Sequence, residues 1–178
     1  ERVESVLVEV ARGIARDTTL EEKARFDALV KLYENQPRFT KRTSTSVENQ
    51  AYSSPLPLAF AASLMAEVTE NTSLYEPTGG LGALTIVADP AKTTVNEIDE
   101  LRRGELEKKG FAEVTGEDAT VYTPPAKHDR VVANPPFGGM DQAVNTDGFI
   151  IKKKEHLIAI RALNAMRDDG SAALILGA

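Results

Sequence analysis

Asn134, Pro135, Pro136 and Phe137 form the stretch of sequence whose residue types are best suited to chemistry. Each proline fixes its own φ angle and pushes the preceding residue out of the helical region. The Asn134 side chain and the neighbouring carbonyls are therefore held with few competing backbone states. Such oxygens could accept the two N–H bonds of a planar amine, whose face would stack on Phe137. The alternative is a proline-rich turn that ends a strand, with asparagine as a turn former.

The elements around this turn predict where it lies. Residues 129–133 read as a short buried strand, so Asn134 stands at a strand's carboxyl end, where open α/β sheets place their ligands. Further strands are expected over 73–76, 93–99, 111–114 and 172–176. The carboxyl ends of parallel strands meet at one edge of the sheet. We therefore expect the polar strand ends to line that edge with Asn134; they are 76–82, 97–99 and 116–119.

The first of these strand ends is a glycine-rich turn that leads into a predicted helix. Gly80 and Gly82 permit a tight turn and a close approach of a ligand to the backbone. Glu97 and Asp99 follow Gly80 by fewer than 20 residues, near where a Rossmann-like fold places the acid that binds ribose hydroxyls. Alone, each signal is weak, because glycine turns and charged strand ends are common.

Helices are expected over the two apolar runs of residues 1–36, with Thr19 and Glu22 as a capping box. Ser54 is expected to cap a helix over 58–69, with Pro55 in the first turn, where free N–H groups attract a carboxylate. The remaining expected elements are a helix over 100–109 ended by Gly110, a loop over 141–148, and an amphipathic helix over 152–167 closed by 168–170. The lysines at 152–154 form a solvated face or point at phosphate.

The alternation of strands and helices predicts an α/β fold, a doubly wound and mainly parallel Rossmann-like sheet with an N-terminal helical extension. The chain has 178 residues, enough for one domain with a sizeable core. It has no cysteine and only two histidines, so no metal site is expected. No apolar run approaches the roughly 20 residues of a membrane span, and no signal peptide is visible, which indicates a cytoplasmic protein. The net charge of −6 counts against a broad nucleic-acid-binding face on this chain.

With these segments in order, residues 48–178 resemble the gamma-type amino-methyltransferases, the N6-adenine DNA methyltransferases. Asn134-Pro135-Pro136-Phe137 is similar to their catalytic motif. The other matching segments are Gln50 to Pro55, with Ser54 and Pro55 at its end, for the methionine-binding segment, Glu76-Pro77-x-x-Gly80-x-Gly82 for the glycine-rich loop, Glu97-x-Asp99 for the ribose acids, and Gly116-Glu117-Asp118-Ala119 for the segment that reads the cofactor adenine.

The resemblance implies methyl transfer from S-adenosylmethionine to adenine N6 in DNA, with the base flipped onto Phe137, as in restriction-modification. It also implies two further strands after residue 176 and a target-recognition domain, so the chain reads as a C-terminally truncated methyltransferase domain, 48–178, after a helical extension, 1–47. DNA binding by this chain alone is expected to be weak, with further domains in the parent protein. A guanine amine in ribosomal RNA, a protein glutamine, or an inactive cofactor-binding scaffold remain alternatives.

Overall fold

The computed structural model describes residues 2–36 and 53–177. Its centre is a sheet of five parallel strands in the order β3-β2-β1-β4-β7. The strands are β1 (Leu74–Glu76), β2 (Thr93–Asn96), β3 (Glu113–Thr115), β4 (His128–Ala133) and β7 (Met166–Leu174). The chain winds outward from β1 to β3 and then returns to place β4 on the other side of β1. The crevice between β1 and β4 is the switch point at which doubly wound sheets bind ligands.

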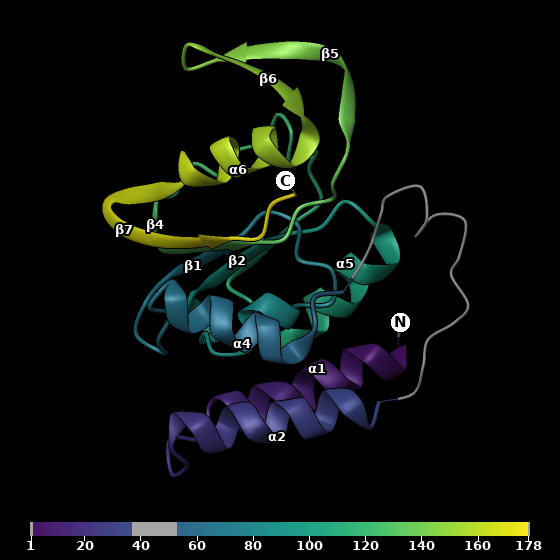
Figure 1. The fold of residues 1–178 in the computed structure, drawn as a ribbon, viewed down its shortest axis with the longest axis vertical. Helices are drawn as coiled ribbons and strands as arrows, with labels where there is room; N and C mark the ends of the chain where they lie inside the picture. Colours follow the sequence, from purple (N-terminus) through teal and green to yellow (C-terminus); the bar gives the residue numbers. More distant parts are fainter. Residues whose placement is uncertain (1, 37–52, 178) are drawn as a thin grey trace.

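Helices cover both faces of this sheet, as the sequence predicted (Figure 1). The helix α6 (Lys154–Leu163) lies on one face, and α4 (Leu56–Met65) and α5 (Glu100–Leu106) lie on the other. The short strands alternate between two cores, because successive strand residues point to opposite faces. Leu74 and Val132 join the core with α4, whereas Tyr75 and Val131 join the core with α6. Such strands, buried on both faces, read as continuous apolar runs.

The N-terminal segment is a helical hairpin, α1 (Arg2–Ala15) and α2 (Glu22–Glu34), that packs beyond α4. Its buried residues, among them Val8, Ala11 and Leu29, belong to the same core as α4. The predicted capping box at its turn is wrong. The N-cap of α2 is Glu21, without a side-chain bond, and the Thr19 hydroxyl donates to Asp17 instead.

The glycine-rich turn leads into a short 3-10 helix, η1 (Ala83–Thr85), and not into the α-helix that we expected. Pro90 lacks an amide hydrogen, so an α-helix that began at Ala83 could not continue through this position. The buried guanidinium of Arg12 donates to the carbonyls of Thr85 and Ala88 at 2.8 and 3.4 Å and stabilises the short segment.

Residues 141–148, predicted as a loop, belong to a two-stranded antiparallel hairpin of β5 (Gly139–Thr146) and β6 (Phe149–Lys153). Asp147 and Gly148 form its two-residue turn with φ angles of 52° and 82°. Two positive φ angles in a row define the type I′ turn, which Asp-Gly favours. The hairpin projects away from the main sheet, past α6 (Figure 1).

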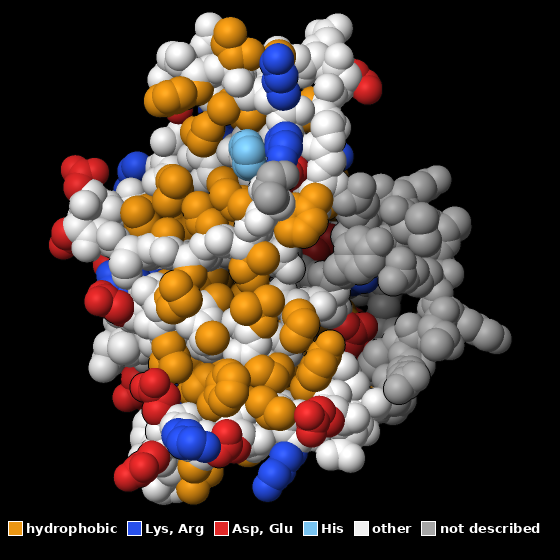
Figure 2. All heavy atoms as spheres, viewed as in Figure 1, with side chains coloured by type: hydrophobic (Ala, Val, Ile, Leu, Met, Phe, Trp, Pro, Cys, Tyr) orange, Lys and Arg blue, Asp and Glu red, His pale blue; other side chains and the backbone are white. Residues whose placement is uncertain are grey.

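The other differences concern element ends. The helix α4 begins at Leu56, two residues before the predicted start, and α6 ends at Leu163. The last strand begins at Met166, so residues 168–170 lie within β7, at a register shift opposite His128 and Arg130. Within the described ranges, no helix combines the length and the apolar character that a membrane span needs. Apolar side chains gather over the middle of the face in Figure 2, where Figure 1 shows α6, β7 and α4.

Candidate functional site

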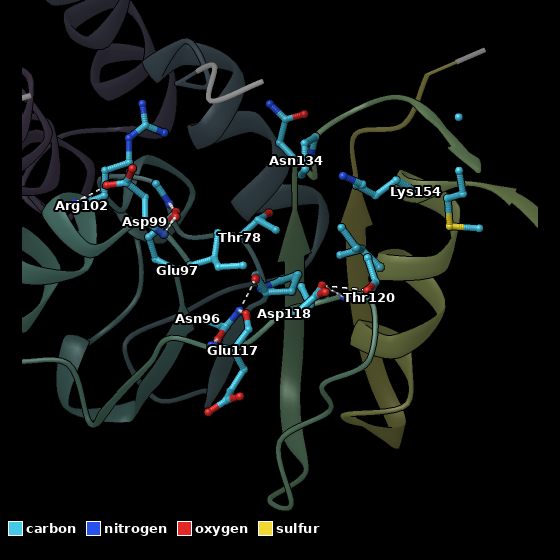
Figure 3. A pocket seen from close by; sticks show the side chains of 18 of the residues that line it. Thr78, Asn96, Glu97, Asp99, Arg102, Glu117, Asp118, Thr120, Asn134 and Lys154 are labelled. Atoms are coloured by element: carbon cyan, nitrogen blue, oxygen red, sulfur yellow. Dashed lines mark hydrogen bonds between the residues drawn. The ribbon is translucent and has the colours of Figure 1, made fainter. Parts of the chain in front are cut away.

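A cavity of about 570 Å³ opens at the carboxyl end of the sheet, beside the switch point. This volume lies in the range of small-molecule sites. Figure 3 shows Glu97, Asp99 and Arg102 on one side of it, Asn134 and Lys154 on the other, and Asp118 between them. The lining residues are Pro77, Thr78, Gly80, Asn96, Glu97, Ile98, Asp99, Arg102, Glu117, Asp118, Ala119, Thr120, Asn134, Pro136, Gly139, Met140, Asp141, Lys154 and Ile158.

Asn134 stands at the end of β4 with its side chain held in one orientation. Its Nδ2 donates to the Ser54 hydroxyl at 3.0 Å. Because the amide nitrogen is engaged there, the amide oxygen is the atom left to accept a hydrogen bond from another group. Ser54 is buried just before α4, whose N-cap is Pro55 and not Ser54. The predicted capping role of Ser54 is therefore wrong, and its hydroxyl serves Asn134 instead.

The turn after Asn134 is clamped at Gly138. The Lys154 amide donates to the Gly138 carbonyl at 2.8 Å, and the Gly138 amide donates to Glu155 Oε2 at 2.9 Å. Glu155 is buried at the start of α6. Both backbone groups of Gly138 are therefore bound to one end of one helix. The clamp fixes residues 134–137 relative to Lys154, which lines the cavity.

Glu97, at the end of β2, grips the glycine-rich turn. Its Oε2 accepts from the Gly80 amide at 2.7 Å, and its Oε1 accepts from the Asp99 amide at 2.8 Å. Burial raises the pKa of Glu97, and these two N–H groups act in the opposite direction. Each carboxylate oxygen has a second lone pair, so the side chain can still accept from a ligand in the cavity.

Asn96 joins three strand ends, and the sequence reasoning missed it. Its Nδ2 donates to the carbonyls of Pro77 and Glu117 at 3.0 and 2.9 Å. Its Oδ1 accepts from the Thr115 hydroxyl and the Glu117 amide at 2.7 and 2.8 Å. All four hydrogen-bonding positions of this buried amide are used. Asn96 thus fixes the relative positions of the segments after β1 and β3.

Asp99 and Asp118 line the cavity, and each also stabilises its own turn. Asp99 Oδ1 caps α5 by accepting from the amides of Leu101 and Arg102, both at 3.0 Å. Asp118 Oδ1 accepts from the Thr120 amide at 2.9 Å and from its hydroxyl at 2.7 Å. The second oxygen of Asp118 is the one available to a ligand donor.

Glu76 and Thr78 carry buried polar atoms with no bonded partner among the described residues, Glu76 Oε2 and Thr78 Oγ1. Glu76 is 2% exposed, and burial raises its pKa well above the ordinary value, with a further contribution from Glu97. Unpartnered buried polar atoms are rare in folded proteins and ask for an explanation. A ligand that donates hydrogen bonds or carries positive charge near the glycine-rich turn would be a partner for these atoms.

The helical hairpin supports the glycine-rich turn from behind. The buried Arg12 guanidinium binds the Thr85 carbonyl and hydroxyl, and it lies 5.4 Å from the centre of the Phe111 ring. Lys109 Nζ donates to the Leu81 carbonyl at 2.7 Å and pairs with Glu9 of α1 at 3.2 Å. Gly82 itself adopts a left-handed φ of 88°, where a side chain would be strained.

The structure brings most of the predicted site residues to this one cavity: Pro77, Gly80, Glu97, Asp99, Asp118, Ala119, Asn134 and Pro136. The others, Ser54, Pro55, Glu76, Gly82, Pro135 and Phe137, lie around it without lining it. Phe137 is 41% exposed beside Gly177. Residues 50–52 of the predicted methionine-binding segment lie outside the described residues. Across ranges 2–36 and 53–177, no three acidic or histidine side chains are grouped as metal ligands would be.

No protein-family model matches the chain, and no curated protein matches it at a significant level of similarity. Among solved structures, it is similar to PH1948 from Pyrococcus horikoshii, a candidate RNA methyltransferase, with a TM-score of 0.56, 19% identity, and coverage of 80% of this chain and 69% of that one. The chain has the Rossmann-like methyltransferase fold. TrmN from Thermus thermophilus is similar to this methyltransferase fold as well, with a TM-score of 0.50 and 20% identity, over 78% of this chain and 44% of TrmN. At these identities the likeness extends to the fold alone.

Proposed function

We propose that this chain transfers a methyl group from S-adenosylmethionine to an exocyclic amine of a nucleic-acid base, with adenine N6 in DNA as the acceptor. The observation that carries the proposal is the geometry of Asn134. Its amide oxygen is free to accept at the rim of the cavity, because Ser54 and the Gly138 clamp fix both the side chain and the turn.

The side chains in and around the cavity match the chemical groups of S-adenosylmethionine. S-adenosylmethionine carries an ammonium, a sulfonium, ribose hydroxyls and an adenine amine, all of which are cationic or can donate hydrogen bonds, besides its single carboxylate. The cavity and its surroundings offer the acceptors that such a ligand needs: the orphaned Glu76 and Thr78 oxygens, Glu97, and the second oxygen of Asp118. Gly80 allows close approach of the backbone.

The residues of the turn would activate the acceptor amine. The lone pair of an aromatic amine is delocalised into its ring, which makes the nitrogen a poor nucleophile. Hydrogen bonds from the amine to Asn134 Oδ1 and to the Pro135 carbonyl would draw that nitrogen towards tetrahedral geometry and localise its lone pair. Preorganised acceptors and alignment contribute in this way without further chemistry from the protein. The bound cofactor supplies the methyl group and its leaving group.

The choice of adenine in DNA rests on the resemblance of residues 134–137 to the gamma-type N6-adenine methyltransferases. A base within a duplex would have to be flipped out to reach Asn134. The exposed Phe137 ring could stack on it there. The likeness to PH1948 keeps an RNA amine as the second candidate, which the same assay tests.

The experiment measures tritiated methyl transfer from S-adenosylmethionine to unmethylated DNA, to RNA and to protein, and identifies the product by mass spectrometry. N6-methyladenine in DNA is the expected product. Asn134→Ala should lower the rate by roughly 10²–10³-fold with cofactor affinity nearly unchanged. Asn71→Ala, an exposed asparagine outside the cavity, is the matched control. A methylated guanine in RNA or a methylated glutamine would reassign the acceptor, and full activity in Asn134→Ala would refute the mechanism.

Cofactor binding has a test of its own. Asp118→Ala should weaken binding of S-adenosylmethionine by about 1–3 kcal/mol, the usual effect of losing a hydrogen bond to a charged group. Asp168→Ala, an exposed acid of β7, should bind like the wild type. Calorimetry that detects no cofactor binding to the wild-type chain would refute this part of the proposal.

A further inference from the structure

The β5–β6 hairpin is joined directly to the candidate site. It begins two residues after Phe137, and its first residues, Gly139, Met140 and Asp141, line the cavity. Among the described residues, the strands of the hairpin pair with each other alone and form a separate sheet from the main one. The start of the hairpin therefore forms part of the wall of the cavity that Asn134 lines.

The surface of the hairpin combines apolar and basic side chains. Phe149 and Ile150, next to the turn, are 65% and 70% exposed. Residues 149–154 carry three lysines and no acid, whereas the rest of the hairpin carries Asp141, at the cavity, and Asp147, in the turn. Lys152 and Lys154 are exposed, and Lys154 lines the cavity. Figure 2 shows basic and apolar side chains together over the region that the hairpin and the start of α6 occupy in Figure 1.

The alternation of the strand arranges these groups along one path. Ile150 and Lys152 are two residues apart in β6, so they share a face of the ribbon. Lys154 follows at the cavity, where its amide is bound to Gly138. An apolar tip, a lysine on the same face and a lysine at the cavity thus lie in sequence from the turn to the site.

We propose that the β5–β6 hairpin is the arm with which this chain holds a nucleic-acid strand beside the cavity, an inference that rests on the proposed function. A two-stranded ribbon fits the major groove of DNA. Lysines neutralise phosphates, and an exposed aromatic ring such as Phe149 stacks on bases. The eight residues of β5 reach up to about 26 Å at about 3.3 Å per residue, comparable to seven or eight base pairs.

A nucleic acid accounts for both features of the hairpin. An apolar protein surface would cover Phe149 and Ile150 but would leave Lys152 without a counter-charge. A polyanion with stacked bases offers partners to both kinds of side chain.

The experiment compares two hairpin variants of the 178-residue chain with matched controls. The hairpin variants are Phe149→Ser with Ile150→Ser, and Lys152→Glu. The controls are Val6→Ser with Val10→Ser, exposed on α1, and Lys31→Glu, exposed on α2. Fluorescence anisotropy with labelled duplex DNA, single-stranded DNA and RNA of 20 nucleotides, at low and at physiological salt, measures affinity in the presence of S-adenosylhomocysteine. Calorimetry with S-adenosylhomocysteine checks that each variant is folded.

Binding is expected at low salt and is expected to weaken as salt rises. The tip double variant should lose roughly tenfold in affinity through lost stacking. Lys152→Glu should weaken binding on all sequences and reduce the salt slope by about 1 or more. Both controls should bind as the wild type does.

Two outcomes of the binding experiment would overturn the inference: no binding of any probe by the wild type, or unchanged affinity in both hairpin variants. Methyl transfer to nucleic acid that survives intact in the hairpin variants would also refute this inference while leaving the proposed function in place. Hairpin-dependent binding without any methylated product would support this inference and refute the proposed function.

Discussion

Asn134 and Ser54 are joined by a single hydrogen bond, from the amide nitrogen to the hydroxyl at 3.0 Å, across 80 positions of the sequence. The bond links the end of β4 to the start of α4. The sequence predicts Ser54 as a helix cap, which is wrong, and the resemblance places it in the cofactor-binding segment, which stays a prediction. The bond indicates a further role as a positioning residue for Asn134, and positioning and cofactor binding have different kinetic consequences.

Ser54→Ala should lower the rate at saturating cofactor roughly fivefold, the effect of about 1 kcal/mol for one neutral hydrogen bond. Cofactor affinity should not change, because the hydroxyl holds the amine-binding residue. Ser54→Thr keeps the hydroxyl and should restore the rate. Steady-state kinetics together with calorimetry make the measurement. Weaker cofactor binding with an unchanged maximal rate would instead place Ser54 on the carboxylate.

Asn96→Ala should lower the free energy of unfolding by about 3 kcal/mol or more, because it leaves several buried partners without a bond. Urea denaturation measures this change. Asn71→Ala, which is exposed, should stay within about 0.5 kcal/mol of the wild type. Equal stability of the two variants would show that the link between strand ends contributes nothing.

Glu76 makes stability depend on pH. Its folded-state pKa is raised by burial, so the folded chain binds a proton more tightly than the unfolded chain does. This contribution is fully present below the unfolded pKa, ordinarily about 4.5, and is lost as pH rises from there through the folded-state pKa. Glu76→Gln should therefore flatten the decline in stability above that pH. Urea midpoints measured across the pH range test this, and a decline that is equally steep in the variant would contradict it.

A cationic cofactor beside Glu76 would favour the ionised carboxylate. Binding of S-adenosylmethionine should therefore release protons in the pH window where Glu76 is protonated in the free protein. Calorimetry in two buffers of different ionisation enthalpy measures this release. Glu76→Gln should abolish it, and proton release that persists in the variant would assign it to another group.

Arg12→Met should destabilise the chain by about 1–3 kcal/mol, because the carbonyls of Thr85 and Ala88 lose a buried donor. It should also weaken cofactor binding, since the same donor holds the segment after the glycine-rich turn. Arg16→Met, exposed on the same helical hairpin, is the control and should change neither quantity. Calorimetry and urea denaturation check both. A destabilised variant with wild-type cofactor affinity would show that the helical hairpin stabilises the fold without affecting cofactor binding.

The parallel sheet and the shared edge of polar strand ends followed from the sequence because both depend on local patterns: short apolar runs and what directly follows them. Asn96 was missed because its role depends on groups from two other strands, Pro77 after β1 and Glu117 after β3. No local pattern distinguishes it from an asparagine that ends a strand. The contact of Arg12 with the carbonyls of Thr85 and Ala88, more than seventy residues later, could not be predicted for the same reason.

The hairpin could have been predicted. Asp147-Gly148 is the strongest short signal for a two-residue hairpin turn, and Phe149, Ile150 and Ile151 follow it as strand formers. The first strand, β5, shows no apolar alternation in the sequence, because both of its faces are largely exposed. The domain division at residue 47 and the further strands expected after residue 176 stay predictions.

The clamp at Gly138 gives residues 139–153 the character of an exchangeable module. The segment leaves and rejoins the fold at a single point, where Gly138 is bound to Lys154 and Glu155. The part of this segment that does not line the cavity, residues 142–152, can lengthen, shorten or change composition while the turn at Asn134 keeps its place. A different ribbon grafted there would change what the chain contacts beside the cavity without rebuilding the residues beneath it.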